Sequence, residues 1–221
     1  MDFHQLVQTV AIYALPVLLA ITLHEAAHGY VARHFGDMTA HAQGRISLNP
    51  ARHIDLVGTI LVPVLILVAS KLAGSAGLLF GWAKPVPVNY SALRRPRQHM
   101  MWVAAAGPGA NLAMALAWAA FYKAADVLPA NDFTQPMLLM GRAGIEVNVI
   151  LMLLNLLPIL PLDGGRIVAS LLPAGLAWRY AKLEPWGFPI LLLLLFTSAL
   201  GVILAPMISF SYRVLGTVFQ I

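Results

Sequence analysis

The sequence predicts an all-α protein that crosses a membrane several times, and three observations support this fold class. First, 60% of the 221 residues are hydrophobic and only 10% are charged, whereas a soluble domain carries about 25% charged residues. Second, the mean hydropathy is +0.79. Third, five apolar stretches are each near or above the ~20 residues that a helix needs to cross a bilayer. They cover approximately residues 6–35, 54–82, 100–125, 136–162 and 186–212.

This composition excludes an ordinary soluble enzyme, a disordered chain and a nucleic-acid-binding module. The net charge of +5 fits basic residues in the cytoplasmic loops of a membrane protein. The chain has no cysteine, which excludes disulfides, iron–sulfur clusters and thiol nucleophiles. Any metal site must therefore use His, Asp, Glu or backbone oxygen ligands.

The first apolar stretch contains the motif H-E-x-x-H, formed by His24, Glu25 and His28. Residues four apart share one face of a helix, so both imidazoles can bind one Zn²⁺. Glu25 lies beside the metal in such a motif and can act as general base on a zinc-bound water. A carboxylate deep in an apolar run is costly and is by default functional. The motif therefore predicts a catalytic zinc site rather than a polar helix end.

The second stretch is less regular than the first. Its interruptions favour a re-entrant segment or two short spans over a simple crossing; they are Pro63, Lys71, Gly74 and Gly77. Polar, turn-rich connections flank it at residues 36–52 and 81–98. Residues 45–48 in the first connection alternate like a short strand, and residues 86–90 in the second are also strand-like. We expect both connections to lie at the membrane interface.

The third stretch is rich in alanine and glycine between residues 104 and 117. Small residues let membrane helices approach closely. Gly107 and Pro108 indicate a kink or a tight contact, and Asn111 can hydrogen-bond across helices or support the site.

The fourth stretch supplies the best candidate for a third metal ligand. Catalytic zinc takes three protein ligands and keeps one position open for water. Asp163 ends this apolar segment, in a Pro- and Gly-containing context that breaks a helix. From spacing alone, ligation and N-capping of the following helix are equally favoured. The other candidates are three histidines in or near the first connection, His34, His41 and His53.

The fifth stretch is interrupted by Pro206. The connection before it, at residues 166–184, is predicted to form a helix that lies in the membrane interface. Its Trp178, Arg179 and Lys182 suit that position.

Three motifs together resemble the site-2 protease family of intramembrane zinc metalloproteases. They are H-E-A-A-H-G at residues 24–29, A-G-P-G-A-N at 106–111 and the segment from Asn155 to Arg166. Residues 81–89, G-W-A-K-P-V-P-V-N, are similar to a segment of compact prokaryotic members. H-E-x-x-H alone is shared by many metalloproteases, but its pairing with a late L-D-G inside hydrophobic segments is highly specific.

The resemblance implies one zinc ion per chain, bound by His24, His28 and Asp163, with Glu25 as the general base. It also implies that Asn155 lies near the active site and orients the substrate or stabilises the oxyanion. The substrates it implies are transmembrane proteins, and the location is the lipid bilayer of a prokaryotic plasma membrane. Because hydrolysis needs an extended substrate backbone, a strand-like segment, at 46–48 or 86–90, is a candidate to pair with the locally unwound substrate; an ordinary interfacial loop is equally favoured.

A shared zinc ion constrains the topology. The histidines lie near the end of the first helix and Asp163 lies at the end of the fourth stretch. Both must reach one depth, so the two helices must run in the same direction. An even number of full crossings must therefore separate them, and the interrupted second stretch is the one expected not to cross.

The basic residues favour the same topology. If the second stretch does not cross, one face carries eleven Lys and Arg residues: Arg33, Arg45, Arg52, Lys71, Lys84, Arg94, Arg95, Arg97, Arg166, Arg179 and Lys182. The other face carries Lys123 and Arg213, with Arg142 near it inside the fourth stretch. Simple alternation of five crossings gives seven against five. The positive-inside rule then places the N-terminus outside and the active site nearer the cytoplasmic face.

We expect residues 1–221 to form a single domain. Its catalytic core covers about 6–166, and an interfacial helix and a membrane segment follow at about 167–221. The function indicated is an intramembrane zinc endopeptidase that cleaves within or near transmembrane helices. One alternative is a membrane metal-ion transporter that uses the same ligands transiently, but a transporter has no need for Glu25. The other is a non-catalytic scaffold that binds transmembrane helices, against which the complete ligand set argues.

Overall fold

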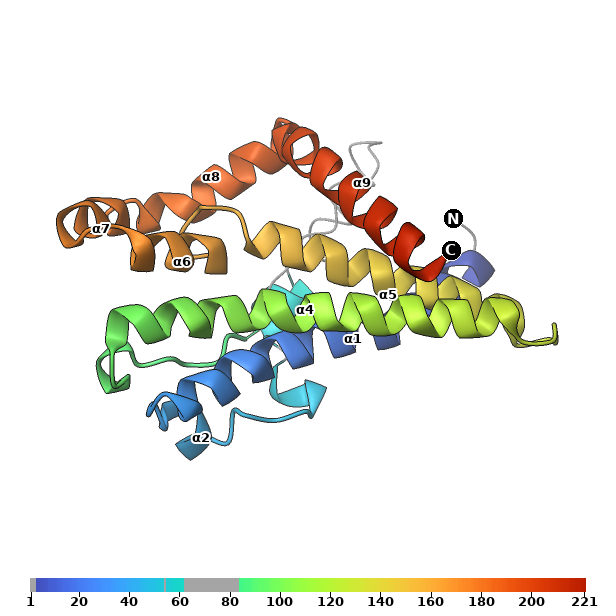
Figure 1. Ribbon diagram of the computed structural model, residues 1–221, viewed down its shortest axis with the longest axis horizontal. Helices are drawn as coiled ribbons and strands as arrows, with labels where there is room; N and C mark the ends of the chain where they lie inside the picture. The colour runs from blue at the N-terminus through green and yellow to red at the C-terminus, as the bar shows by residue number, and fades with distance from the viewer. Residues whose placement is uncertain (1–2, 54, 62–83) are drawn as a thin grey trace.

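The computed structural model describes residues 3–53, 55–61 and 84–221. Within these ranges the chain is largely helical (Figure 1). None of the described residues belongs to a strand, which confirms the predicted all-α class. The elements in chain order are α1 (Phe3–His34), α2 (Thr39–Ala42), η1 (Pro50–Arg52), η2 (Leu56–Leu61), η3 (Tyr90–Ala92), α4 (Pro96–Val127), α5 (Thr134–Asn155), α6 (Asp163–Leu171), α7 (Ala174–Ala181), α8 (Glu184–Phe196) and α9 (Ala199–Phe219).

Four of the described helices are long and apolar enough to cross a membrane. They are α1 (from Val7), α4, α5 and α9, and they correspond to the first, third, fourth and fifth predicted stretches. The second stretch lies almost entirely outside the described residues, so its re-entrant or split character stays a prediction. The part of it that is described is η2, a short π-helix.

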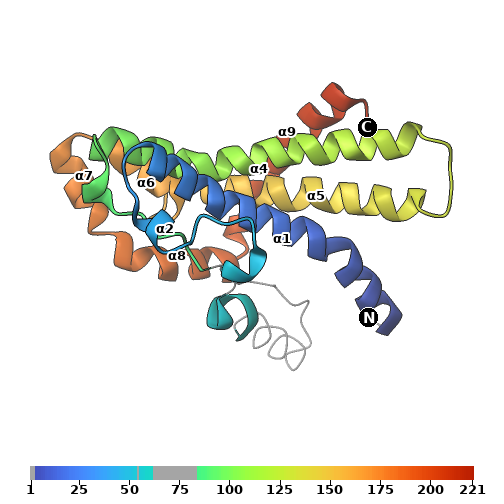
Figure 2. The same cartoon turned by 90° about the horizontal axis from the view of Figure 1, so that it is seen from below.

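The three helices that carry the motifs form the centre of the bundle. Helix α4 packs against both α1 and α5, and α1 also contacts α5. Helices α1 and α5 run in the same direction and α4 runs opposite to them (Figures 1 and 2). This is the relative direction that a site shared by the ends of α1 and α5 requires.

The contact between α4 and α5 depends on glycine. Ala115 and Ala119 are fully buried on α4, beside Trp118. A Cβ atom on Gly144 of α5 would lie 2.2 Å from Cδ2 of Trp118, closer than packed atoms allow. The close approach of these two helices therefore rests on a glycine of the fourth stretch. Of the small residues between 104 and 117, Ala104, Gly107 and Ala115 are buried, whereas Gly109, Ala113 and Ala117 are exposed.

The C-terminal region differs from the prediction in two respects. The predicted interruption at Pro206 is wrong, because α9 runs through that residue and the chain instead turns at Ser198, which has a left-handed backbone (φ 59°). A proline inside a membrane helix is tolerated where neighbouring groups satisfy the freed backbone atoms. The predicted interfacial helix at 166–184 is divided into α6 and α7, which are separated at Pro173.

The two polar connections lie side by side without forming strands. The Arg45 guanidinium donates to the carbonyl oxygens of Arg52, Lys84 and Pro85, at 2.7–3.2 Å. The fully buried Asp37 accepts a hydrogen bond from the backbone N–H of Asn89 at 2.6 Å. Arginine and carboxylate side chains thus join these loops, and neither strand-like segment, 45–48 or 86–90, forms a strand.

Candidate metal centre

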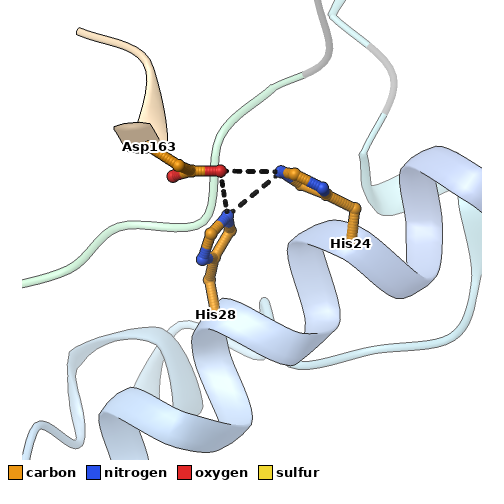
Figure 3. Close-up of side chains that lie close together, drawn as sticks. All are labelled: His24, His28 and Asp163. Atoms are coloured by element: carbon orange, nitrogen blue, oxygen red, sulfur yellow. Dashed lines mark hydrogen bonds and ion pairs between the residues drawn. The ribbon is translucent and has the colours of Figure 1, made fainter. Parts of the chain in front are cut away.

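The structure brings His24, His28 and Asp163 together at one point (Figure 3). Nε2 of His24 lies 3.1 Å from Nε2 of His28. Oδ2 of Asp163 lies 3.3 Å from each of these nitrogens. Each of the three residues is at least nine-tenths buried. Three ligand atoms from segments more than a hundred residues apart in the sequence therefore face one another inside the bundle.

Local sequence places each of the three side chains. The four-residue spacing puts both histidines on one face of α1. Asp163 is the first residue of α6, and the N-cap position belongs to Leu162, whose side chain makes no capping hydrogen bond. The N-capping interpretation of Asp163 is therefore wrong, and its carboxylate turns toward the histidines instead.

Two glycines allow α6 to begin so close to the end of α5. A Cβ atom on Gly164 would lie 2.2 Å from the carbonyl oxygen of Leu156. One on Gly165 would lie 2.6 Å from the backbone of Ile159. The Asp-Gly-Gly sequence thus lets the start of α6 rest directly on the preceding linker and fixes the position of Asp163.

The histidines are held with their Nε2 atoms facing inward. Nδ1 of His24 lies 2.6 Å from Oδ1 of Asn111, and Nδ1 of His28 lies 2.7 Å from the carbonyl oxygen of Val103. Because both neighbours are acceptors, each Nδ1 carries the proton and donates. A neutral imidazole in this tautomer presents a lone pair at Nε2. The two rings therefore present lone pairs to the same point as the Asp163 carboxylate.

This convergence fits a metal cation. Three electron-rich atoms without hydrogen between them repel one another unless a positive charge lies among them. Oδ2 of Asp163 is buried and has no hydrogen-bond partner within the described chain beyond these close contacts. Zinc–nitrogen and zinc–oxygen bonds of about 2.0–2.1 Å in tetrahedral geometry place ligand atoms about 3.3 Å apart. The observed 3.1–3.3 Å agrees with that spacing.

Asp163 is ionised at neutral pH. Burial acts to raise its pKa, but proton donation and positive charge at the adjacent histidines outweigh burial and lower the pKa of Asp163 to about 2. A cation held among the three side chains, with both rings neutral, would favour the carboxylate in the same direction. An aspartate with this pKa is available as an anionic ligand across the physiological range.

Helix α4 touches both imidazoles through a position without a side chain. A Cβ atom on Gly107 would lie 2.4 Å from Nε2 of His28 and 2.6 Å from Nε2 of His24. Gly107 belongs to the A-G-P-G-A-N motif, and only its missing side chain leaves room for the two rings. The tight contact expected at this glycine is thus a contact with the candidate metal ligands.

Sequence analysis missed Asn148 of α5. It is fully buried, its Oδ1 accepts from Nδ2 of Asn111 at 2.9 Å, and its own Nδ2 donates to the carbonyl oxygen of Gly144. Asn111 in turn accepts from His24, so the chain of hydrogen bonds runs from α5 through α4 to the candidate ligand. The available signal was a carboxamide in the middle of an apolar run, where polar side chains need partners.

Glu25 is held by the second polar connection. Its Oε2 accepts a hydrogen bond from the backbone N–H of Val86 at 2.7 Å. Val86 lies in the G-W-A-K-P-V-P-V-N segment, which therefore reaches the candidate general base. The side chain of Glu25 is partly exposed, so its other oxygen is available for proton transfer.

The remaining candidates do not join the cluster. Nδ2 of Asn155 donates to Leu151 of its own helix. Nε2 of the buried His53 contacts the carbonyl oxygen of Ser47. His34 and His41 are also outside the His24–His28–Asp163 group, which is the one group of this kind among the described residues.

Two curated proteins are similar to the chain over most of its length. The "Putative zinc metalloprotease YwhC" of Bacillus subtilis (strain 168) is 38% identical over 203 residues, covering 88% of this chain and 84% of that protein. The "Putative zinc metalloprotease Rip2" of Mycolicibacterium smegmatis (strain ATCC 700084 / mc(2)155) is 28% identical over 188 residues, covering 83% of this chain and 66% of that protein. No family model matches the chain. No solved structure matches it either.

We predict that Gly107→Ala weakens or abolishes metal binding. The new methyl group would overlap both imidazole rings, which their Nδ1 hydrogen bonds prevent from turning aside. Zinc content per chain, measured after purification and dialysis, should fall well below that of the unmodified protein. The matched control is Gly109→Ala on the same helix, because a Cβ atom there meets nothing within 4 Å. Equal zinc content in both variants would contradict the contact.

We also predict that Asn148→Leu lowers zinc affinity about 10- to 100-fold, the usual cost of losing a group that orients a ligand. Without Asn148, the Asn111 amide nitrogen loses the shorter of its two hydrogen bonds, at 2.9 Å, and keeps the one to the carbonyl oxygen of Ala20 at 3.3 Å, so its oxygen is held less firmly toward His24. Competition with a zinc chelator measures the affinity directly. Ser211→Ala on α9 is the control, since the Ser211 hydroxyl bonds only within its own helix as far as the described contacts show. Unchanged affinity in Asn148→Leu would show that the chain of carboxamides does not orient the histidine.

Proposed function

Because the chain belongs to the site-2 protease family of zinc metalloproteases, we propose that it is an intramembrane zinc endopeptidase that hydrolyses peptide bonds within or near the transmembrane helices of other proteins. The observation that carries this proposal is the convergence of His24, His28 and Asp163 with Glu25 beside them. The motif helix α1 is also a candidate membrane span, so a site on it serves substrates in the bilayer.

In this proposal His24, His28 and Asp163 hold one zinc ion. Zinc bound there would polarise the scissile carbonyl and acidify a water molecule. Glu25 accepts a proton from that water and passes it to the leaving amine. The Val86 N–H holds one oxygen of Glu25 in place, which leaves the second oxygen to face the water.

Asn155 is proposed, from the family resemblance, to orient the substrate or stabilise the oxyanion. Its amide nitrogen donates to Leu151 at 3.0 Å. To serve as an oxyanion donor, the amide must exchange this bond for one to the substrate, or use its second N–H.

A substrate helix must unwind before its carbonyl groups become accessible, and an extended segment can pair with a strand of the enzyme. Within residues 86–90, Pro87 has no N–H, while Val86 and Asn89 already donate within the protein. Val88 and Tyr90 are therefore the residues of this segment that could donate to a substrate strand. No hydrogen bond of the described residues uses the N–H groups of residues 46–48, and this favours 46–48 for that role.

We predict that Glu25→Gln lowers the rate of cleavage of a model transmembrane peptide about 10²- to 10⁴-fold, the usual contribution of general base catalysis. Zinc content should stay near one per chain, because Glu25 is not a proposed ligand. Asp163→Ala should weaken zinc binding and cleavage together. Glu184→Gln, which changes an exposed carboxylate on α8, is the matched control.

The same set of variants separates the alternatives. A transporter would keep its function in Glu25→Gln, and a scaffold would bind transmembrane helices without cleaving them. Full zinc occupancy in Asp163→Ala would place the third ligand elsewhere.

We propose further that the active site lies nearer the cytoplasmic face of the plasma membrane. The chain has no cysteine, so Ala92→Cys and Ala130→Cys each introduce a single thiol. Both positions are exposed, and they lie beyond the two opposite ends of α4. An impermeant maleimide added to intact cells should label Ala130→Cys and should reach Ala92→Cys only after permeabilisation. The reverse pattern would invert the topology.

A further inference from the structure

A second polar site lies between α4, α5 and α9, in the half of the bundle that carries the α4–α5 turn. A cavity of about 390 Å³ opens there. Its lining combines two charged residues, two tyrosines and apolar groups: Tyr122, Arg142, Ile145, Glu146, Tyr212, Leu215, Gly216 and Ile221.

This cavity is separate from the candidate metal centre. Arg142 precedes the end of α5 at Asn155 by thirteen residues, which corresponds to about 20 Å along a helix. The metal centre lies beyond that end, at the start of α6. The two sites therefore occupy opposite halves of the membrane-spanning bundle.

The two charged side chains of the cavity are not paired with each other. Arg142 and Glu146 lie one helical turn apart on α5, yet no ion pair joins them among those of the described residues. Oε2 of Glu146 accepts a hydrogen bond from the Tyr13 hydroxyl at 3.0 Å, which fixes the carboxylate from the α1 side. The Arg142 side chain is exposed. Ionisable side chains within a membrane span are costly, and they are by default functional.

The chemistry of the lining points to a ligand with two charges. A guanidinium binds phosphate through two parallel hydrogen bonds. A carboxylate one turn away suits a primary ammonium group, which donates hydrogen bonds as well as carrying charge. The apolar part of the lining suits the hydrocarbon next to such a head group. The depth also agrees, because Arg142 lies about 12 Å into α5 and a long arginine side chain can reach toward the interface.

We propose that this cavity binds the headgroup of a phospholipid that carries both a phosphate and a primary amine, with the phosphate on Arg142 and the amine beside Glu146. Phosphatidylethanolamine is the simplest lipid of this class. The site then holds one lipid molecule against α5 and α9, on the side of the bundle away from the metal. The proposal does not depend on proteolytic activity.

The test uses the full chain, exchanged into nanodiscs of phosphatidylcholine with either phosphatidylethanolamine or phosphatidylglycerol, and then released for native mass spectrometry. We expect one phosphatidylethanolamine retained per chain, in preference to the other two lipids. Arg142→Gln should lower its retention about tenfold, the effect of removing one hydrogen-bonded charge. Glu146→Gln should remove the preference for phosphatidylethanolamine over phosphatidylglycerol while phosphate binding remains.

The controls separate a built site from general surface charge. Arg213→Gln removes an exposed arginine of α9 that does not line the cavity, and it should leave retention unchanged. Zinc content of each variant reports that the bundle is intact. Glutamine at position 146 can still accept from Tyr13, so the Glu146→Gln arm remains decisive if Arg142→Gln does not fold.

Three outcomes would overturn the proposal. The first is equal retention of the three lipids by the unmodified protein. The second is a loss in Arg213→Gln as large as in Arg142→Gln. The third is retention of inorganic phosphate or soluble glycerophosphoethanolamine as strong as that of the lipid, which would make the ligand a soluble phosphate compound.

Discussion

The structure depends on one electrostatic constraint, the meeting of three electron-rich atoms inside a membrane-embedded bundle. Nε2 of His24, Nε2 of His28 and Oδ2 of Asp163 lie 3.1–3.3 Å apart, and because the three residues are buried, the repulsion between their lone pairs is weakly screened. A cation relieves that repulsion. The same meeting sets the topology, since α1 and α5 must run in parallel for the end of one to reach the start of α6 beyond the other.

Helix α4 allows the three ligand atoms to meet because it carries no side chain at the point where it contacts the two histidines. Its Gly107 faces the two imidazoles with no side chain between. Four residues further along the same helix, Asn111 supplies the oxygen that orients His24. One face of α4 therefore both admits the histidines and fixes their tautomer, which is why a motif of small residues ends in an asparagine. The contact of Gly107 with the imidazoles and the hydrogen bond from His24 to Asn111 thus depend on the same placement of α4 against α1.

The sequence was sufficient for those parts of the molecule that follow from spacing and apolar length. The pair His24 and His28 follows from helical periodicity, and the crossing helices follow from the length of the apolar runs. Asp163 did not follow from spacing, because an aspartate before two glycines can cap a helix as well as bind a metal. The geometry of α6 distinguishes these roles, since Leu162 occupies the cap position.

Other features depend on tertiary contacts that no local pattern encodes. Asn148 has the same local setting as any isolated polar residue in an apolar helix, and its role depends on a carboxamide that lies 37 positions away in the sequence. The turn before α9 occurs at Ser198 although Pro206 is the stronger local signal. A membrane helix can absorb a proline, and the chain changes direction between α8 and α9 at Ser198 instead (Figure 1). Residues 45–48 alternate like a strand yet form none, because the two loops are joined by the side chains of Arg45 and Asp37, which an alternating pattern does not reveal.

The carboxamide pair explains how such a site can keep its shape before any metal binds. Asn111 uses its oxygen on His24 and its nitrogen on Asn148 and on the carbonyl oxygen of Ala20. Asn148 is satisfied in turn by Gly144. In water, each of these groups could exchange its partner for solvent at little cost, but both asparagines are fully buried, and a broken bond there leaves an unsatisfied polar group. The network therefore keeps its shape because breaking any of its hydrogen bonds would leave a buried polar group unsatisfied. His24 is presented with Nε2 inward because another orientation of the ring would leave the buried Oδ1 of Asn111 without its donor.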